Sequence, residues 1–123
     1  MDEQRQLIVI LEDDAGLRRA VERLLRLSGF CTRSFHSAED AHVAEFACAA
    51  RCLVIDVHLP GISGPLFYET LQAPRPPAVF MTAYEGPRIR RAIESTGAQA
   101  VLTKPFPGDA LIEEILKATG GPC

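Results

Sequence analysis

Five short hydrophobic runs recur along the chain, and segments with a helical spacing of apolar residues separate them. The runs are residues 7–11, 30–35, 52–55, 78–82 and 100–103. Most of them are continuously apolar rather than alternating, which is typical of parallel strands covered on both faces. The pattern therefore predicts five parallel strands joined by crossover helices.

Helical patterns follow the predicted strands. Leu17 and Val21 share one face of a helix, and Gly29 is a residue of the kind that ends one. The segment SAED has the form of a capping box, with Ser37 as the N-cap and Asp40 in the acidic third position, so a second helix is expected to begin there. The other helices are expected from the end of the 59–64 loop to about residue 71, at 87–95 and at 109–118. The order predicts an α/β domain with a five-stranded parallel sheet.

Length and composition fit one soluble domain. The chain has 123 residues, of which 47% are hydrophobic and 24% charged. No apolar run approaches the roughly 18 residues that span a membrane, and the polar start does not resemble a secretory signal, which predicts a cytoplasmic protein. The net charge of -3 argues against direct DNA binding by the domain itself. Residues 1–119 are expected to form the domain, and 120–123 to begin a linker.

The four cysteines match no common metal motif. Cys31, Cys48, Cys52 and Cys123 include no C-x-x-C pair. We interpret them as small apolar residues in a reducing compartment, with a metal shared by Cys48 and Cys52 as the open alternative.

Polar chemistry follows four of the five predicted strands. These strands end in residues that carry a charge or a hydroxyl: Glu12, Asp13, Asp14, Asp56, Thr82 and Lys104. The carboxyl ends of parallel strands meet at one edge of the sheet, where such folds place their ligands. Converging carboxylates raise one another's pKa unless a cation lies among them, and hard oxygen ligands suit Mg²⁺. Mg²⁺, a lysine and a hydroxyl together suit a phosphoryl group, for which Asp56 is a candidate nucleophile.

At these positions the sequence resembles the receiver domain of bacterial two-component response regulators. The motifs are ILEDDAGLR (10–18), LVIDVHLPGISG (53–64), VFMTAY (79–84) and LTKPF (102–106), and the resemblance covers about residues 6–119. It implies a flavodoxin-like (βα)5 fold. The last two motifs are particularly similar to receivers that precede helix-turn-helix DNA-binding outputs, as in nitrogen-fixation regulators.

The resemblance implies a ligand set and a phosphoryl acceptor. Asp56 matches the acceptor, and a sensor histidine kinase is the implied phosphoryl donor. Asp13 matches a direct Mg²⁺ ligand and Glu12 a ligand through water, while Asp56 and the backbone carbonyl of His58 supply further oxygens. Mn²⁺ is an expected substitute for Mg²⁺.

The resemblance also implies a switch. Thr82 matches the hydroxyl that moves to the phosphoryl group, Lys104 matches the lysine that pairs with its oxygens, and the Lys104–Pro105 bond is expected to be cis. The domain would then catalyse only its own phosphotransfer and dephosphorylation, and would not be an enzyme with an external substrate. Its expected output is control of transcription, through a DNA-binding effector domain outside these residues.

Two features depart from the family pattern. Val101 stands where an aromatic switch residue is usual, so signal transmission is expected to rely on shifts of the 87–95 helix and the 100–103 strand. His58 and Tyr84 occupy positions that tune the lifetime of the phosphoryl group in the family, and the bulk of Tyr84 predicts slower hydrolysis.

Some charged residues have a structural interpretation. Asp14 lies three residues before Leu17, where an N-cap belongs, and capping is favoured over metal ligation. The arginines of the 87–95 helix are interpreted as a solvated face, with an interface as the second interpretation: Arg88, Arg90 and Arg91. The resemblance implies a homodimer through this helix and the 100–103 strand when the domain is phosphorylated.

Three alternatives to a phosphoacceptor switch remain. A haloacid-dehalogenase-type phosphatase also uses an aspartate and Mg²⁺, but it needs a second aspartate where this chain has His58. A flavodoxin-like FMN protein needs a first loop that holds phosphate, and the acids after residue 11 would repel it. A receiver used only for docking would not need the acids, Thr82 and Lys104.

Overall fold

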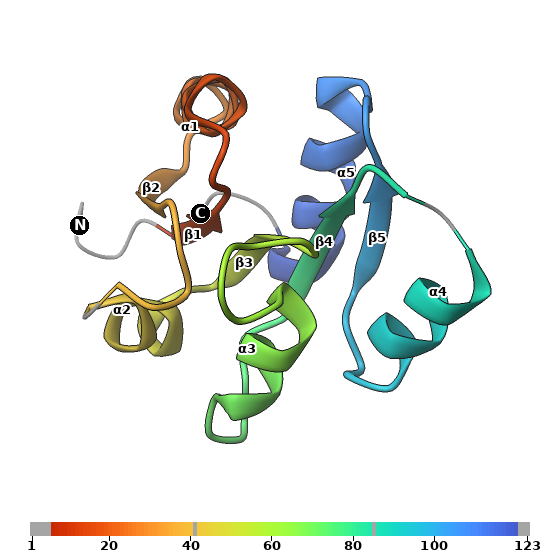
Figure 1. The fold of residues 1–123 in the computed structure, drawn as a ribbon. Coiled ribbons are helices and arrows are strands. Elements are labelled where there is room, and N and C mark those ends of the chain that lie inside the picture. The colour runs from red at the N-terminus through yellow and green to blue at the C-terminus, as the bar shows by residue number, and fades with distance from the viewer. Residues whose placement is uncertain (1–5, 41, 85, 121–123) are drawn as a thin grey trace.

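The computed structural model describes residues 6–40, 42–84 and 86–120. In this part of the chain strands and helices alternate (Figure 1), in the order β1 (Leu7–Leu11), α1 (Ala15–Leu27), β2 (Cys31–Phe35), α2 (Val43–Ala49), β3 (Cys52–Asp56), α3 (Gly64–Thr70), β4 (Ala78–Thr82), α4 (Pro87–Glu94), β5 (Ala100–Thr103) and α5 (Gly108–Thr119). The strands form one parallel sheet in the order β2-β1-β3-β4-β5. The predicted α/β fold with a five-stranded parallel sheet is confirmed.

The sheet lies between two layers of helices. On one face, Leu53 and Phe80 pack in a core with residues of α2, α3 and α4. On the other face, Ile10 and Met81 pack with residues of α1 and α5. Because both faces are covered, every residue of β3 and β4 is buried. This double burial is the reason that the strands read as continuous apolar runs.

The chain reverses its direction of winding at β1. It leaves β1 toward β2 on one side, then crosses to β3 on the other side of β1. The loops that follow β1 and β3 therefore diverge to opposite faces and leave a crevice at the carboxyl edge, the usual ligand position in such sheets. The predicted acids lie beside this crevice, Glu12 and Asp13 on the loop after β1 and Asp56 at the end of β3.

The predicted capping box at residues 37–40 is wrong. Ser37 Oγ accepts a hydrogen bond from the backbone N–H of Glu39, and Asp40 Oδ1 accepts one from His42. Each side chain bonds two residues ahead, which stabilises turns in place of a helix. Helix α2 begins only at Val43, and its N-cap residue makes no side-chain capping bond.

The described cysteines are free thiols at different depths. Cys52 is buried in the core under α1 and α5, and burial raises the pKa of its thiol to about 12. Cys48 is exposed on α2. Cys123 and the end of the expected linker lie outside the described residues. Among the described helices, none has the length and apolar character needed to cross a membrane.

Candidate functional site

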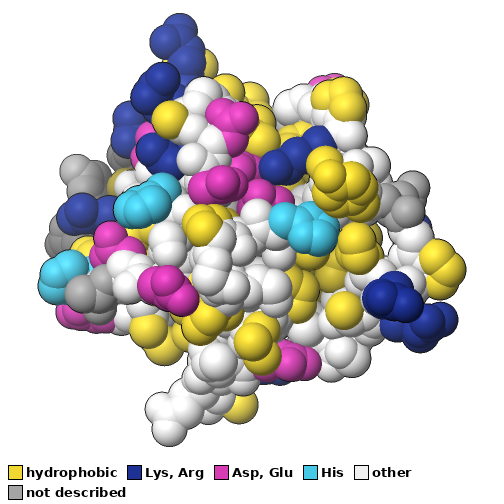
Figure 2. All heavy atoms as spheres, in the orientation of Figure 1, with side chains coloured by type: hydrophobic (Ala, Val, Ile, Leu, Met, Phe, Trp, Pro, Cys, Tyr) yellow, Lys and Arg dark blue, Asp and Glu magenta, His cyan; other side chains and the backbone are white. Residues whose placement is uncertain are grey.

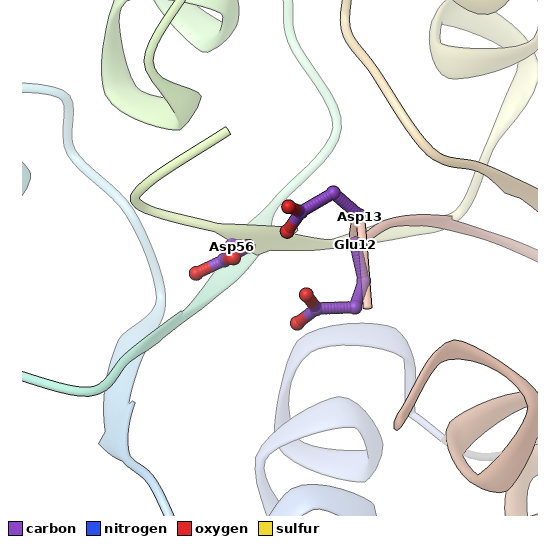
Figure 3. A group of neighbouring side chains, drawn as sticks. All are labelled: Glu12, Asp13 and Asp56. Carbon is purple, nitrogen blue, oxygen red and sulfur yellow. The ribbon is translucent and has the colours of Figure 1, made fainter. Parts of the chain in front are cut away.

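Three carboxylates meet at the carboxyl edge of the sheet. Glu12 and Asp13 follow β1, and Asp56 is the last residue of β3. Their side chains project into a common space (Figure 3), and one ligand oxygen from each lies within 4.8 Å of the others. Glu12 and Asp56 are buried, whereas Asp13 is exposed. Figure 2 shows acidic side chains gathered at the centre of the visible face, next to basic and histidine side chains.

Lys104 reaches this cluster from the turn after β5. Its Nζ lies 2.9 Å from Glu12 Oε1 and 3.5 Å from Asp56 Oδ1. The other oxygen of Glu12 accepts a hydrogen bond of 3.0 Å from the backbone N–H of Asp14. Arg18 on α1 donates to the backbone carbonyl of Glu12 at 2.8 Å. Glu12 is therefore held from both sides by groups of the chain itself.

Burial and charge act in opposite directions on this pair. Burial raises the pKa of Glu12, and the hydrogen bond from Lys104 only partly offsets that rise. For Lys104, burial favours the neutral amine, but the hydrogen bond to Glu12 and the nearby Asp56 together raise its pKa. The ammonium therefore stays charged and stabilises a carboxylate that burial disfavours.

Asp56 is fixed by the loop that follows it. The backbone N–H of His58 donates to Asp56 Oδ1 at 3.3 Å. Among the described residues, no group donates a hydrogen bond to Oδ2. The first residue of α3, Gly64, packs directly on the Asp56 backbone, where an added Cβ would collide with the carbonyl oxygen. Ser63 caps α3 by accepting from the N–H of Leu66.

Thr82 ends β4 but is not hydrogen-bonded to the acids. Its hydroxyl donates to the backbone carbonyl of Tyr84 at 2.8 Å and accepts from the N–H of Tyr84 at 3.1 Å. The ring of Tyr84 makes an edge contact with His58, with 5.2 Å between ring centroids. Val101 on β5 borders the same hollow as Thr82 and Tyr84.

The remaining residues named from the sequence have defined places. The peptide bond between Lys104 and Pro105 is cis. Asp14 accepts from the N–H of Leu17 at 3.1 Å and is the N-cap of α1, as predicted. The donor set fits a hard divalent cation, because three carboxylates converge and one of them is open to solvent.

Two positions were missed in the sequence. Gly64 appeared only as part of a loop, although its contact with Asp56 tolerates no side chain. Arg18 appeared only as a helix residue, although it fixes the backbone of Glu12. The second glycine of LPGISG, which stands directly before an apolar helix, is the one signal in the sequence for Gly64. Nothing in the sequence near Arg18 indicates its partner.

Curated proteins of known function are similar to this chain in sequence. Nodulation protein W of Bradyrhizobium diazoefficiens is 34% identical over 119 residues, which are 94% of this chain and 52% of that protein. The C4-dicarboxylate transport transcriptional regulatory protein DctD of Rhizobium meliloti is 31% identical, over 90% of this chain and 25% of its own length. The chain thus spans a quarter to about half of these relatives.

Solved structures share the fold. A response regulator receiver protein from Burkholderia phymatum has a TM-score of 0.81 at 28% identity, covering 96% of this chain and 99% of that chain. The chemotaxis protein CheY4 of Vibrio cholerae has a TM-score of 0.82 at 19% identity, over 92% of this chain and 98% of that one. Residues 8–116 match the family described as response regulator receiver domain. The chain belongs to the response regulator receiver domain family.

Proposed function

We propose that this domain accepts a phosphoryl group on Asp56 from the phosphohistidine of a sensor histidine kinase, in a reaction that needs Mg²⁺. The observation that carries the proposal is the placement of Asp56 between two further carboxylates and the ammonium of Lys104. A buried nucleophilic carboxylate beside a fixed cation is the arrangement that phosphoryl transfer requires.

The transfer forms one bond and breaks one. A carboxylate oxygen of Asp56 attacks the phosphorus, the phosphorus–nitrogen bond of phosphohistidine breaks, and the imidazole nitrogen takes the bonding electron pair. The free Oδ2 is the candidate nucleophile, because Oδ1 already accepts from His58 and faces Lys104. Lys104 offsets the negative charge on the phosphoryl oxygens. Hydrolysis returns the domain to its unphosphorylated form: water attacks the phosphorus, inorganic phosphate leaves, and the Asp56 carboxylate is restored.

The cation would be held by Asp13, Asp56 and the backbone carbonyl of His58, with Glu12 contributing through water. When bound, Mg²⁺ supplies positive charge to the phosphoryl oxygens. Both oxygens of Glu12 are already engaged by Lys104 and by the Asp14 N–H, which supports an indirect role for Glu12. Asp13, exposed at the mouth of the site, supports a direct one. Mn²⁺ has the same preference for oxygen ligands.

The phosphorylated state is proposed to act through Thr82 and the α4–β5 face. Thr82 would donate to the phosphoryl group, and His58, whose backbone N–H bonds to Asp56, would limit the access of water. Exposed arginines on α4 support a partner surface there, which we assign to a homodimer of phosphorylated domains. The names of relatives such as DctD support transcriptional control as the output, through a separate DNA-binding domain. We also propose a cytoplasmic location, which membership in the response regulator receiver domain family supports.

Labelling with acetyl phosphate and Mg²⁺ tests the acceptor. The wild-type domain should gain one phosphoryl group by intact mass, and the bond should be stable in acid and labile in base, as an acyl phosphate is. Asp56→Asn should lose the label, and so should the wild type with a chelator. Asp109→Asn, on the exposed first turn of α5, is the matched control and should label as the wild type does. Full labelling of Asp56→Asn would refute the assignment.

A further inference from the structure

We propose that Tyr84 supplies the moving aromatic ring of this switch, in place of the ring that Val101 lacks. On phosphorylation, its side chain leaves His58, enters the hollow between α4 and β5, and displaces the first turn of α4. This inference rests on the proposed phosphorylation of Asp56 and adds the element that carries the signal away from it.

Thr82 couples the acceptor to Tyr84. The Thr82 hydroxyl donates its one hydrogen to the backbone carbonyl of Tyr84 and accepts a hydrogen bond from the backbone N–H of the same residue. A hydroxyl has one donor hydrogen, so donation to a phosphoryl oxygen on Asp56 removes the bond to the Tyr84 carbonyl. The backbone at Tyr84 is then released at the moment the acceptor is modified.

The ring of Tyr84 has little to hold it where it lies. Its side chain is 64% exposed, and its ring contact is an edge contact with His58 at 5.2 Å. Such a contact contributes only about 0.5–1.5 kcal/mol beyond the area that it buries. His58 donates its backbone N–H to Asp56 Oδ1, so a change at Asp56 also disturbs the partner of the ring.

A hollow for the ring adjoins Tyr84. Its cavity volume is only about 10 Å³, it is partly open to solvent, and its lining includes Thr82, Tyr84, Ile89, Arg90, Ile93 and Val101. Its lining is almost wholly apolar, as suits the face of an aromatic ring. The hollow is narrow, and protein interiors are close-packed, so a ring that enters between Ile89 and Val101 must push α4 outward.

The C-terminal end of helix α4 is tied to the neighbouring segment. At its C-terminal end Arg75 donates to the carbonyl of Thr96 and lies over the Tyr68 ring at 4.7 Å, which ties the helix to α3. At the other end the N-cap is Gly86, which makes no side-chain capping bond. Figure 1 shows α4 at the edge of the fold, beside β5. Entry of the ring therefore turns α4 about its Thr96 end and moves Pro87 to Arg90.

Tyrosine fluorescence tests the movement directly. The chain has two tyrosines and no tryptophan, and Tyr68 is only 3% exposed. Subtracting the signal of Tyr84→Phe from that of the wild type isolates Tyr84. We expect its quenching by acrylamide to fall several-fold when the domain is treated with acetyl phosphate and Mg²⁺, with the extent of labelling measured by mass on the same sample.

Substitutions at Val101 provide the matched pair. Val101→Phe fills the hollow, so the labelled variant should keep Tyr84 open to quenching, whereas Val101→Ala leaves the hollow open and should preserve the loss of quenching. A labelled wild type with unchanged quenching overturns this inference alone, as does an undiminished loss in Val101→Phe. Absence of the label on Asp56 overturns the proposed function and this inference together.

Discussion

The site has two halves that are built differently. The acidic half, formed by Glu12, Asp13, Asp56 and Lys104, joins three strand ends, and the ion pairs of Lys104 with Glu12 and Asp56 connect residues far apart in the chain. The switch half consists of Thr82, Tyr84, Val101 and the first turn of α4. There the hydrogen bonds of Thr82 connect neighbours in sequence, the Tyr84 ring is exposed, and a hollow separates α4 from β5.

The difference assigns chemistry and response to separate places. Nucleophilic transfer needs charges held before the reaction, which the packed acidic half supplies. A response needs two arrangements of similar free energy, and sparse contacts such as those of the switch half are where local rearrangement costs least. The two halves meet at the carboxyl ends of β3 and β4, because these adjacent strands end in Asp56 and Thr82.

Two glycines give the largest contrast between the halves. In Gly64→Ala the new Cβ would collide with the Asp56 carbonyl oxygen and the Ile55 side chain, so we expect a loss of about 3 kcal/mol in the free energy of unfolding. In Gly86→Ala nothing lies within 4 Å of the new atom, and the loss should stay below about 1 kcal/mol. Urea denaturation measures both. Equal losses would mean that the halves are packed alike.

Two lysines give the next contrast. Lys104→Met leaves the buried carboxylate of Glu12 without its cation and should cost about 2 kcal/mol of unfolding free energy in the absence of divalent ions. Lys117→Met removes a surface pair with Glu114 at 3.6 Å and should cost less than about 0.5 kcal/mol. Parallel urea curves test the difference. A Lys104→Met variant as stable as Lys117→Met would show that the acidic half is not held by its ion pair.

Much of this arrangement was predictable because the sheet is covered on both faces. Continuous apolar runs located the strands, and in a parallel sheet the residues after each strand must gather at one edge. That argument predicts that Glu12, Asp13, Asp56 and Lys104 lie together, and the structure places them within reach of one another. The family match then decides against the phosphatase and FMN alternatives.

What was not predictable depends on competition between local and distant bonds. Ser37 and Asp40 can cap a helix or close a turn, and their pattern is the same in both cases; here they close turns. The direction of the Thr82 hydroxyl follows from the path of its own loop. The link from Arg75 to Thr96 joins residues 21 positions apart, and no periodicity reports such a contact.

The smallest expected effect is the pH dependence of the unfolding free energy that arises from burial of Glu12 in the acidic half. Burial raises the pKa of Glu12 in the folded domain above its ordinary value of 4.5, which an unfolded chain retains. Above pH 4.5 the unfolded state therefore releases this proton first, and the folded state binds more protons. Stability contributed through Glu12 must then fall as the pH rises through this window.

The comparison of wild type with Glu12→Gln measures this contribution, because glutamine keeps an acceptor for Lys104 and does not titrate. With a chelator present, the unfolding free energy of the wild type minus that of Glu12→Gln should decrease as the pH rises above 4.5. The exposed Glu113→Gln serves as the control and should show no such slope. A difference that increases with pH would mean that Lys104 lowers the pKa of Glu12 by more than burial raises it. The charged carboxylate would then be favoured in the acidic half even without a bound cation or phosphoryl group.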